Sequence, residues 1–245
     1  MQEQRSRFGV TLATLPVLAG IRERARAETT AEIVRLARVQ VEHDGATSLS
    51  LRAIARDLGM VSSAIYRYFA SRDELLTRLI VDSYDRLGAA VEAADARVRS
   101  GDLRGRWRAE ANSLRRWAME NPSEYALLFG TPVPGYAAPP DTIGPASRYT
   151  TVLMRLLVDI EAANGEVAGV VPVALRRDFA RLRVSFPVPR SDVLLMNGLN
   201  SWAGMMGAIS LELFGHLHNV IDTPGALFDA LVEQYADLLA PEAAP

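Results

Sequence analysis

The sequence predicts an all-α fold in two parts, a short N-terminal three-helix domain and a larger C-terminal helical bundle. Apolar residues recur at helical spacing through most of the 245 residues, which is the pattern of amphipathic helices. No window shows the strict alternation of apolar and polar residues that predicts a strand. A hydrophobic content of 49% is enough for a core in each part.

The segment SLRAIARDLGM predicts a short helix followed by a turn. Ser50 is a preferred N-cap residue, and the apolar residues from Leu51 to Leu58 fall on one helical face. Gly59 stands where the end of a helix needs a residue that tolerates the left-handed conformation. Ala55 is small at the point where a second helix must cross closely.

A second short helix is predicted in the segment SSAIYRYF. We expect Ser62 to cap it, Ile65 and Phe69 to point back towards the preceding helix, and Tyr66 and Arg67 to lie on the other side. Two helices with this spacing form a helix-turn-helix, which presents the start of its second helix to the major groove of DNA.

Two capping boxes predict the flanking helices. Thr29-x-x-Glu32 indicates a first helix that begins near Thr29 and ends near His43. Ser71-x-x-Glu74 indicates a long helix that connects the helix-turn-helix to the rest of the chain. The expected organisation is a flexible N-terminal arm over residues 1–21, a helix-turn-helix domain over 22–70, a connecting helix over 71–98 and a C-terminal regulatory and dimerisation domain over 99–240.

The C-terminal part predicts six further helices separated by loops. The proline-rich segment TPVPGYAAPPDTI is one such loop. The expected helices are Leu103–Glu120, Pro122–Phe129, Ile143–Ala163, Pro172–Val184, Asp192–His216 and Pro224–Leu239.

Two uncharged stretches could be mistaken for a signal peptide or a membrane span. Residues 8–21 superficially resemble the apolar region of a signal peptide, but Gly9 and Pro16 interrupt them, which favours an arm. The stretch Val193–Leu211 has 19 residues without a charge, which is the low end of a membrane-spanning length. Its asparagines, serines and glycines favour a helix buried in a bundle or a subunit interface, so no membrane association is expected.

The segment from Arg22 to Asp85 resembles the DNA-binding domain of the tetracycline repressor (TetR) family of bacterial transcription regulators. The matching pieces are TTAEIVRLARVQVEHDGATSLS, LRAIARDLGM, SSAIYRYF and SRDELL, in that order. Hydroxyl groups and arginines in and around the turn can reach phosphates or base edges, and the resemblance implies that these positions meet double-stranded DNA. The candidate DNA-binding residues are Thr47, Arg52, Ser62, Ser63, Tyr66, Arg67, Tyr68 and Arg72.

The segment SWAGMMGAISLELFGHL resembles the C-terminal domain of one branch of that family, which is called the WHG domain after a Trp, His, Gly pattern. Trp202 and Gly207 match the pattern, whereas Met206 stands at the His position. No role of the missing imidazole is therefore carried over. The segment ENPSEYALLFG is also similar to that branch.

The charges are distributed unevenly along the chain. Residues 1–78 hold twelve arginines and nine acidic residues, whereas residues 79–245 hold fifteen arginines and twenty acidic residues. A basic first part on an acidic second part fits a DNA-binding domain joined to a regulatory core. All 27 basic residues are arginine, so lysine-dependent chemistry such as a P-loop or a Schiff base is excluded.

No catalytic residue, metal site or cofactor is predicted. The chain has no cysteine, which excludes a thiol nucleophile and fits a reducing cytoplasm. There is no Gly-x-Ser-x-Gly motif of a hydrolase. Glu212, His216 and His218 have a spacing that a metal could use, but a helix C-terminus explains the histidines without one.

The second part is rich in aromatic and methionine side chains that suit an apolar cavity with a few polar anchors. Core packing is the alternative role for each of them. The candidate ligand-binding residues are Trp107, Leu114, Trp117, Tyr125, Phe129, Tyr149, Met154, Phe179, Trp202 and Met205.

These patterns predict a homodimeric repressor that leaves a palindromic operator when a small, largely apolar effector binds. Self-association is expected through the helices around residues 192–216 and 224–239, because a two-fold axis relates the halves of a palindrome. The alternatives are an activator, a ligand-independent regulator or, in a different class, a helical small-molecule-binding protein or enzyme.

Overall fold

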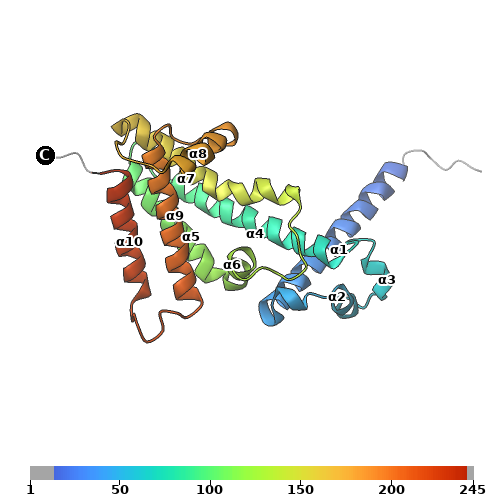
Figure 1. Cartoon of the computed structure of the whole chain (residues 1–245). Helices are drawn as coiled ribbons and strands as arrows, with labels where there is room; N and C mark the ends of the chain where they lie inside the picture. Colours follow the sequence, from blue (N-terminus) through green and yellow to red (C-terminus); the bar gives the residue numbers. More distant parts are fainter. Residues whose placement is uncertain (1–13, 242–245) are drawn as a thin grey trace, which may run out of the picture. The chain divides into compact units, whose positions relative to one another are not determined.

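The computed structural model describes residues 14–241, and the prediction of an all-α fold is confirmed, because this range contains helices and no strand (Figure 1). The two short 3-10 helices are η1 (Ala46–Ser48) and η2 (Pro140–Thr142). The α-helices are α1 (Thr14–Asp44), α2 (Leu51–Asp57), α3 (Ser62–Ile65), α4 (Arg72–Asp95), α5 (Leu103–Glu120), α6 (Pro122–Phe129), α7 (Ile143–Asn164), α8 (Val173–Ser185), α9 (Asp192–Leu213) and α10 (Pro224–Leu239).

The chain divides into two compact units, Met1–Leu79 and Ile80–Pro245. We call their described parts the head, residues 14–79, and the body, residues 80–241. The boundary falls inside α4, so this helix begins in the head and ends in the body.

The helix-turn-helix of the head is built as its sequence signals predict. The Ser50 hydroxyl accepts a hydrogen bond from the backbone N–H of Ala53 at 3.4 Å and so caps α2. Gly59 has a φ of +64° in the turn, a conformation that favours glycine. Ile65 and Phe69 are buried in the core of the head.

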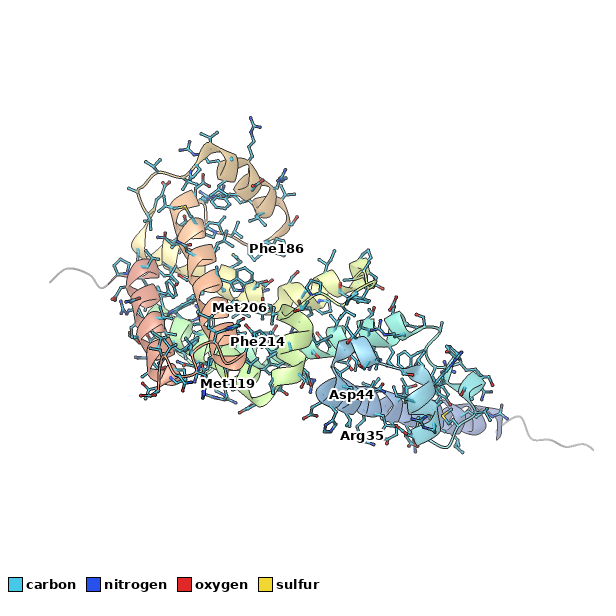
Figure 2. The ribbon with its side chains drawn as sticks, turned by 60° about the horizontal axis from the view of Figure 1, so that its bottom comes forward. Arg35, Asp44, Met119, Phe186, Met206 and Phe214 are labelled. Carbon is cyan, nitrogen blue, oxygen red and sulfur yellow. The ribbon has the colours of Figure 1, made fainter. Side chains whose placement is uncertain are left out.

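The first helix does not begin at the predicted capping box, and neither Thr29 nor Glu32 acts as a cap. It runs through Thr29 without a break, and the Thr29 hydroxyl donates to the backbone oxygen of Ala25 at 2.9 Å. A threonine inside a helix can bond back one turn in this way. Arg35 lies on this helix (Figure 2). Its Nη2 atom pairs with Oε1 of Glu32 at 2.7 Å, so the Glu32 carboxylate does not complete the predicted capping box.

The N-terminal arm and the second cap also need correction. Residues 14–21 of the expected arm are helical, and residues 1–13 lie outside the described part of the chain. Ser62 is the first residue of α3, while extended Val61 takes the N-cap position without a side-chain bond. By contrast, Ser71 caps α4 as predicted, since its hydroxyl accepts from the backbone N–H of Glu74 at 3.1 Å.

The six predicted helices of the body are confirmed, and their ends agree within about three residues. Helices α5, α7, α9 and α10 pack around one core, whose fully buried large side chains include Trp107, Tyr125 and Phe228. Helix α8 covers a smaller cluster made of Val171, Phe179 and Leu195.

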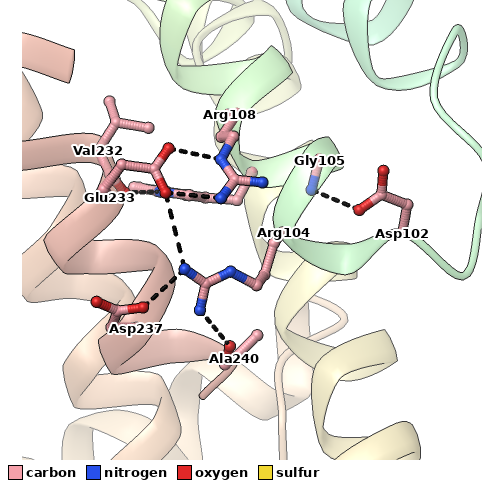
Figure 3. A network of polar contacts seen from close by, with 9 residues as sticks. Asp102, Arg104, Gly105, Arg108, Val232, Glu233, Asp237 and Ala240 are labelled. Carbon is pink, nitrogen blue, oxygen red and sulfur yellow. Dashed lines mark hydrogen bonds and ion pairs between the residues drawn. The ribbon is translucent and has the colours of Figure 1, made fainter. Parts of the chain in front are cut away.

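Arginines on α5 tie this helix to α10 (Figure 3). Arg108 makes a bidentate ion pair with Glu233, with both N–O distances 2.6 Å. Arg104 donates to Asp237 at 2.7 Å and to the backbone oxygen of Ala240 at 3.1 Å. The two helices are therefore held by polar contacts at the surface as well as by the core.

Helix α9, which contains the uncharged stretch Val193–Leu211, does not qualify as a membrane span, and neither does any other helix of the described residues. One side of α9 is buried, including Gly198, Ser201 and Met205. The opposite side, with Gly207 and Leu211, is exposed in the single chain.

Candidate functional site

The helix-turn-helix exposes a polar edge over an apolar base. Within α3 and the turn that follows it, Ala64 and Ile65 are buried, while Ser63, Tyr66 and Arg67 are exposed. This division follows from helical geometry, because residues three or four apart share a face. The exposed groups are a hydroxyl, a phenol and a guanidinium, which are common phosphate and base-edge ligands.

The same edge carries positive charge. Residues 50–72 contain four arginines and one acidic residue. Arg52 on α2 and Arg67 after α3 are exposed, as are Thr47 and Ser62. A local excess of guanidinium groups attracts the phosphate backbone, which supplies much of the affinity in protein–DNA complexes.

Arg72 lies differently from the other candidate DNA ligands. Its guanidinium donates to the backbone oxygens of Ala46 at 2.8 Å, Leu49 at 3.2 Å and Thr47 at 3.3 Å. It therefore holds the segment that presents Thr47, and its geometry is that of a positioning residue.

Tyr68 is half-buried beside Arg26 of α1. The guanidinium carbon of Arg26 lies 5.2 Å from the centre of the Tyr68 ring, a cation–π arrangement. Arg26 also donates to the backbone oxygen of Arg67 at 2.8 Å. Helix α1 thus fixes the chain that follows α3, a role that the sequence analysis missed.

Five of the candidate ligand-binding residues surround a cavity of about 20 Å³ in the body. These residues come from three helices that are distant in the sequence, α5, α7 and α9. Val91 of α4 completes the apolar wall. The five predicted residues are Trp107, Leu114, Tyr149, Trp202 and Met205.

Four of the other five candidates lie in the surrounding core, and the fifth lies in the cluster under α8. The Tyr125 hydroxyl is hydrogen-bonded to Ser210 at 2.8 Å and to the backbone oxygen of Met206 at 3.2 Å. Phe129 packs edge-on against Tyr149, with ring centres 6.0 Å apart. Trp117 and Met154 pack within the same core, and Phe179 belongs to the cluster under α8.

A carboxyl group also lines the cavity, and the sequence analysis missed it. Glu110 is only 4% exposed, and its Oε1 atom has no hydrogen-bond partner. Burial, reinforced by the negative charge of Asp95, raises the pKa of Glu110 well above its usual value, and Arg106 opposes this shift. The available signal was its position three residues after Trp107 and four before Leu114, on the inward face of α5.

Arg106 is itself neutralised by two other carboxylates. Its Nε and Nη2 atoms donate to Asp95 at 2.6 and 3.2 Å, and its Nη1 atom donates to Asp159 at 2.7 Å. These bonds raise the pKa of Arg106 above its usual value, so the guanidinium stays charged. An ionised Glu110 would therefore add a third anion to a site that already holds two anions and one cation.

The metal arrangement considered from the sequence is not formed. Glu212 makes a bidentate ion pair with Arg115, at 2.6 and 2.8 Å. Residues 14–241 contain no group of three or more potential metal ligands close enough to hold an ion.

Two family models match the chain. Residues 29–79 match the model of bacterial regulatory proteins of the tetR family, and residues 107–235 match the model of the tetracyclin repressor-like C-terminal domain. The HTH-type transcriptional regulator Rv1816 of Mycobacterium tuberculosis strain H37Rv is 43% identical over 230 residues, which cover 90% of this chain and 96% of that protein.

Solved structures share the fold. The crystal structure of SCO4313 matches with a TM-score of 0.73 and 36% identity, over 87% of this chain and 97% of that one. A protein of unknown function from Rhodococcus sp. RHA1 matches with a TM-score of 0.65 over 86% of this chain and 95% of its own, and its 23% identity shows the fold alone.

Proposed function

Because this chain belongs to the TetR family of DNA-binding transcriptional regulators, we propose that it is a homodimeric repressor that a small effector releases from a palindromic operator in the bacterial cytoplasm. The observation that carries the DNA part is the polar edge of α3, where Ser63, Tyr66 and Arg67 are exposed above a buried apolar base. The family is one of regulators, which also favours this function over the enzyme alternative.

The exposed side of α9 supports self-association. Ala203, Gly207, Leu211 and Phe214 are exposed and recur at helical spacing without a charge. A Cβ atom added at Gly207 would meet nothing within 4 Å, so a neighbouring helix has room to approach closely. An uncharged stripe of this kind is suited to another apolar surface.

Helix α10 adds apolar surface beside α9. Leu227 and Leu238 on this helix are 36% and 41% exposed, and the two helices pack along each other. We infer that α9 and α10 meet their copies in a second chain, which supplies the two-fold axis that a palindromic operator requires.

Effector binding is assigned to the cavity of the body, and α4 is the element that can transmit it. Val91 lines the cavity, and the same continuous helix begins at Arg72 in the head. A displacement of Val91 by a ligand would therefore move a helix that also supports the helix-turn-helix. This proposal requires the effector to favour a position of α4 that binds the operator less tightly.

DNA binding by the full-length protein tests the central proposal. We expect specific binding to one palindromic segment of DNA from around the coding region, which weakens as salt is raised because phosphate contacts release counterions. The variant Arg52→Ala, Tyr66→Phe should bind less tightly, whereas Arg177→Ala, at an exposed position of α8, should bind like the wild type. Binding that ignores DNA sequence and all of these variants would contradict the proposal.

The dimer is tested by placing a charge on the uncharged stripe. Leu211→Glu should give a monomer of 26.7 kDa by light scattering, where the wild type gives twice that mass. Val184→Glu is the matched control, because Val184 is 87% exposed on α8. A Leu211→Glu protein that remains dimeric would exclude α9 as the interface.

A further inference from the structure

We propose that the cavity of the body is a cation site, and that the effector is an apolar amine or quaternary ammonium compound whose charge is held by Glu110. This inference rests on the proposed regulation by an effector and names the chemical class of that effector. It follows from an unpaired carboxyl oxygen, the surrounding charges, the aromatic walls and the small size of the cavity.

The first argument is the Oε1 atom of Glu110, which has no hydrogen-bond partner although the side chain also contacts Asp95. The Glu110 side chain is buried and lines the cavity, and Oε1 makes no hydrogen bond within the described residues. Native proteins pair nearly all buried polar atoms, because an unpaired one loses its hydration without compensation. A bound group that carries a positive charge would supply the missing interaction and would favour the ionised form of Glu110.

The local charges exclude an anionic ligand. Arg106, the nearest cation, is already shared between Asp95 and Asp159, with N–O distances of 2.6 and 2.7 Å. The site therefore has two carboxylates for one guanidinium before Glu110 is counted. A ligand with a positive charge reduces this imbalance, whereas a carboxylate or phosphate would increase it.

The walls of the cavity are suited to an organic cation. Trp107, Tyr149 and Trp202 line it together with aliphatic side chains. The faces of aromatic rings attract ammonium groups, and this attraction is strongest where water is excluded. The buried indole N–H of Trp202 interacts with the Tyr149 hydroxyl and can donate instead to a polar atom of the ligand.

The size of the cavity links binding to a movement of helices. A volume of about 20 Å³ holds little more than one water molecule. An organic cation must therefore push the walls apart. Val91 brings α4 to this wall, and Met205 of α9 is an unbranched side chain that can change its conformation. Displacement of α4 is the step that the proposed repressor mechanism requires.

The test uses two soluble molecules of the same shape that differ in charge. Choline carries a quaternary ammonium group, and 3,3-dimethylbutan-1-ol carries a neutral tert-butyl group in its place. Binding to the full-length protein is followed by tryptophan fluorescence, because Trp107 and Trp202 line the cavity, and by the rise in melting temperature. Hexyltrimethylammonium is included as a cation with a longer apolar chain.

We expect at least one of the two cations to bind roughly tenfold or more tightly than the neutral alcohol. Glu110→Gln should lose this preference while it binds the alcohol unchanged. Glu120→Gln, at an exposed position on the same helix, should behave like the wild type. Failure of both cations to bind, equal binding of choline and the alcohol, or tight cation binding by Glu110→Gln would overturn the proposal.

Operator release is measured separately on the same protein. A cation that binds through Glu110 but leaves the operator complex intact would support the cation site and contradict effector release. Specific operator binding by a protein that binds neither cation would support the regulator and overturn the cation site.

Discussion

Two arginines of the helix-turn-helix in the head are exposed to solvent, whereas several arginines of the body join one helix to another. Arg52 and Arg67 are exposed on the polar edge. Arg106 and Arg115, by contrast, make bidentate pairs with Asp95 and Glu212. The same residue type therefore offers charge to a partner in one region and neutralises charge inside the other. Substitution of an exposed arginine of the head should lower DNA affinity, whereas substitution of a paired arginine of the body should lower stability.

The largest expected effect is the loss of stability in Arg106→Ala. Arg106 is 8% exposed, and its removal would leave Asp95 and the buried Glu110 without the cation that bonds to the first and attracts the second. Breaking one side of a buried ion pair costs about 3–5 kcal/mol. Urea unfolding of Arg106→Ala and of Arg177→Ala, the exposed control, measures this difference. Equal stability of the two variants would mean that the ion pairs of Arg106 do not stabilise the body.

Arg67→Ala should have the reverse profile. The free energy of unfolding should change by less than about 0.5 kcal/mol, because Arg67 is exposed. Operator affinity should fall roughly 10- to 100-fold, and the salt dependence should decrease by about two counterions per dimer if each copy contacts one phosphate. Titrations at several salt concentrations measure both quantities. An unchanged salt slope would show that Arg67 contacts no phosphate.

Signals within a few residues of each other predicted the head well. Ser50 as a cap and Gly59 as a left-handed turn residue depend on local backbone geometry alone. The same local reasoning failed at Thr29, because a capping box is also compatible with the interior of a helix that continues upstream. A residue caps a helix only where the backbone before it is not helical, and a short motif does not contain that information.

The cavity could be predicted only in part, because it depends on contacts between helices that are distant in the sequence. Trp107 and Tyr125 both lie on inward helical faces, yet only Trp107 lines the cavity. The spacing of apolar residues along a helix is the same whether a side chain fills the core or lines a cavity. Glu110 escaped notice because its burial is decided by α4, α7 and α9 together.

Close packing of the body gives the next prediction. A Cβ atom added at Gly198 of α9 would overlap a methyl group of Leu157, which is fully buried and must shift within a packed core. Gly198→Ala should therefore lower the free energy of unfolding by about 1–3 kcal/mol. Gly20→Ala, at an exposed position inside α1, is the control, because nothing lies within 4 Å of the new Cβ atom. Denaturant unfolding of both variants distinguishes overlap from helix propensity, which favours alanine at either position.

The smallest expected effect is a pH-dependent gain of stability in Glu110→Gln. The folded state raises the pKa of Glu110 above its value of 4.5 in the unfolded chain. The folded state therefore favours the protonated form of Glu110. The stability linked to this group is present below pH 4.5 and is lost as the pH rises through the folded pKa.

Glutamine does not titrate, so the melting temperature of Glu110→Gln relative to the wild type should increase as the pH is raised above 4.5. Glu120→Gln should show no such trend, because Glu120 is exposed. Thermal melts of the three proteins across this range measure the difference. A constant difference would mean that Glu110 keeps its ordinary pKa. The expected trend would instead mean that the body keeps a buried carboxyl group at a cost to its own stability. The exposed residues of the polar edge in the head carry no such cost.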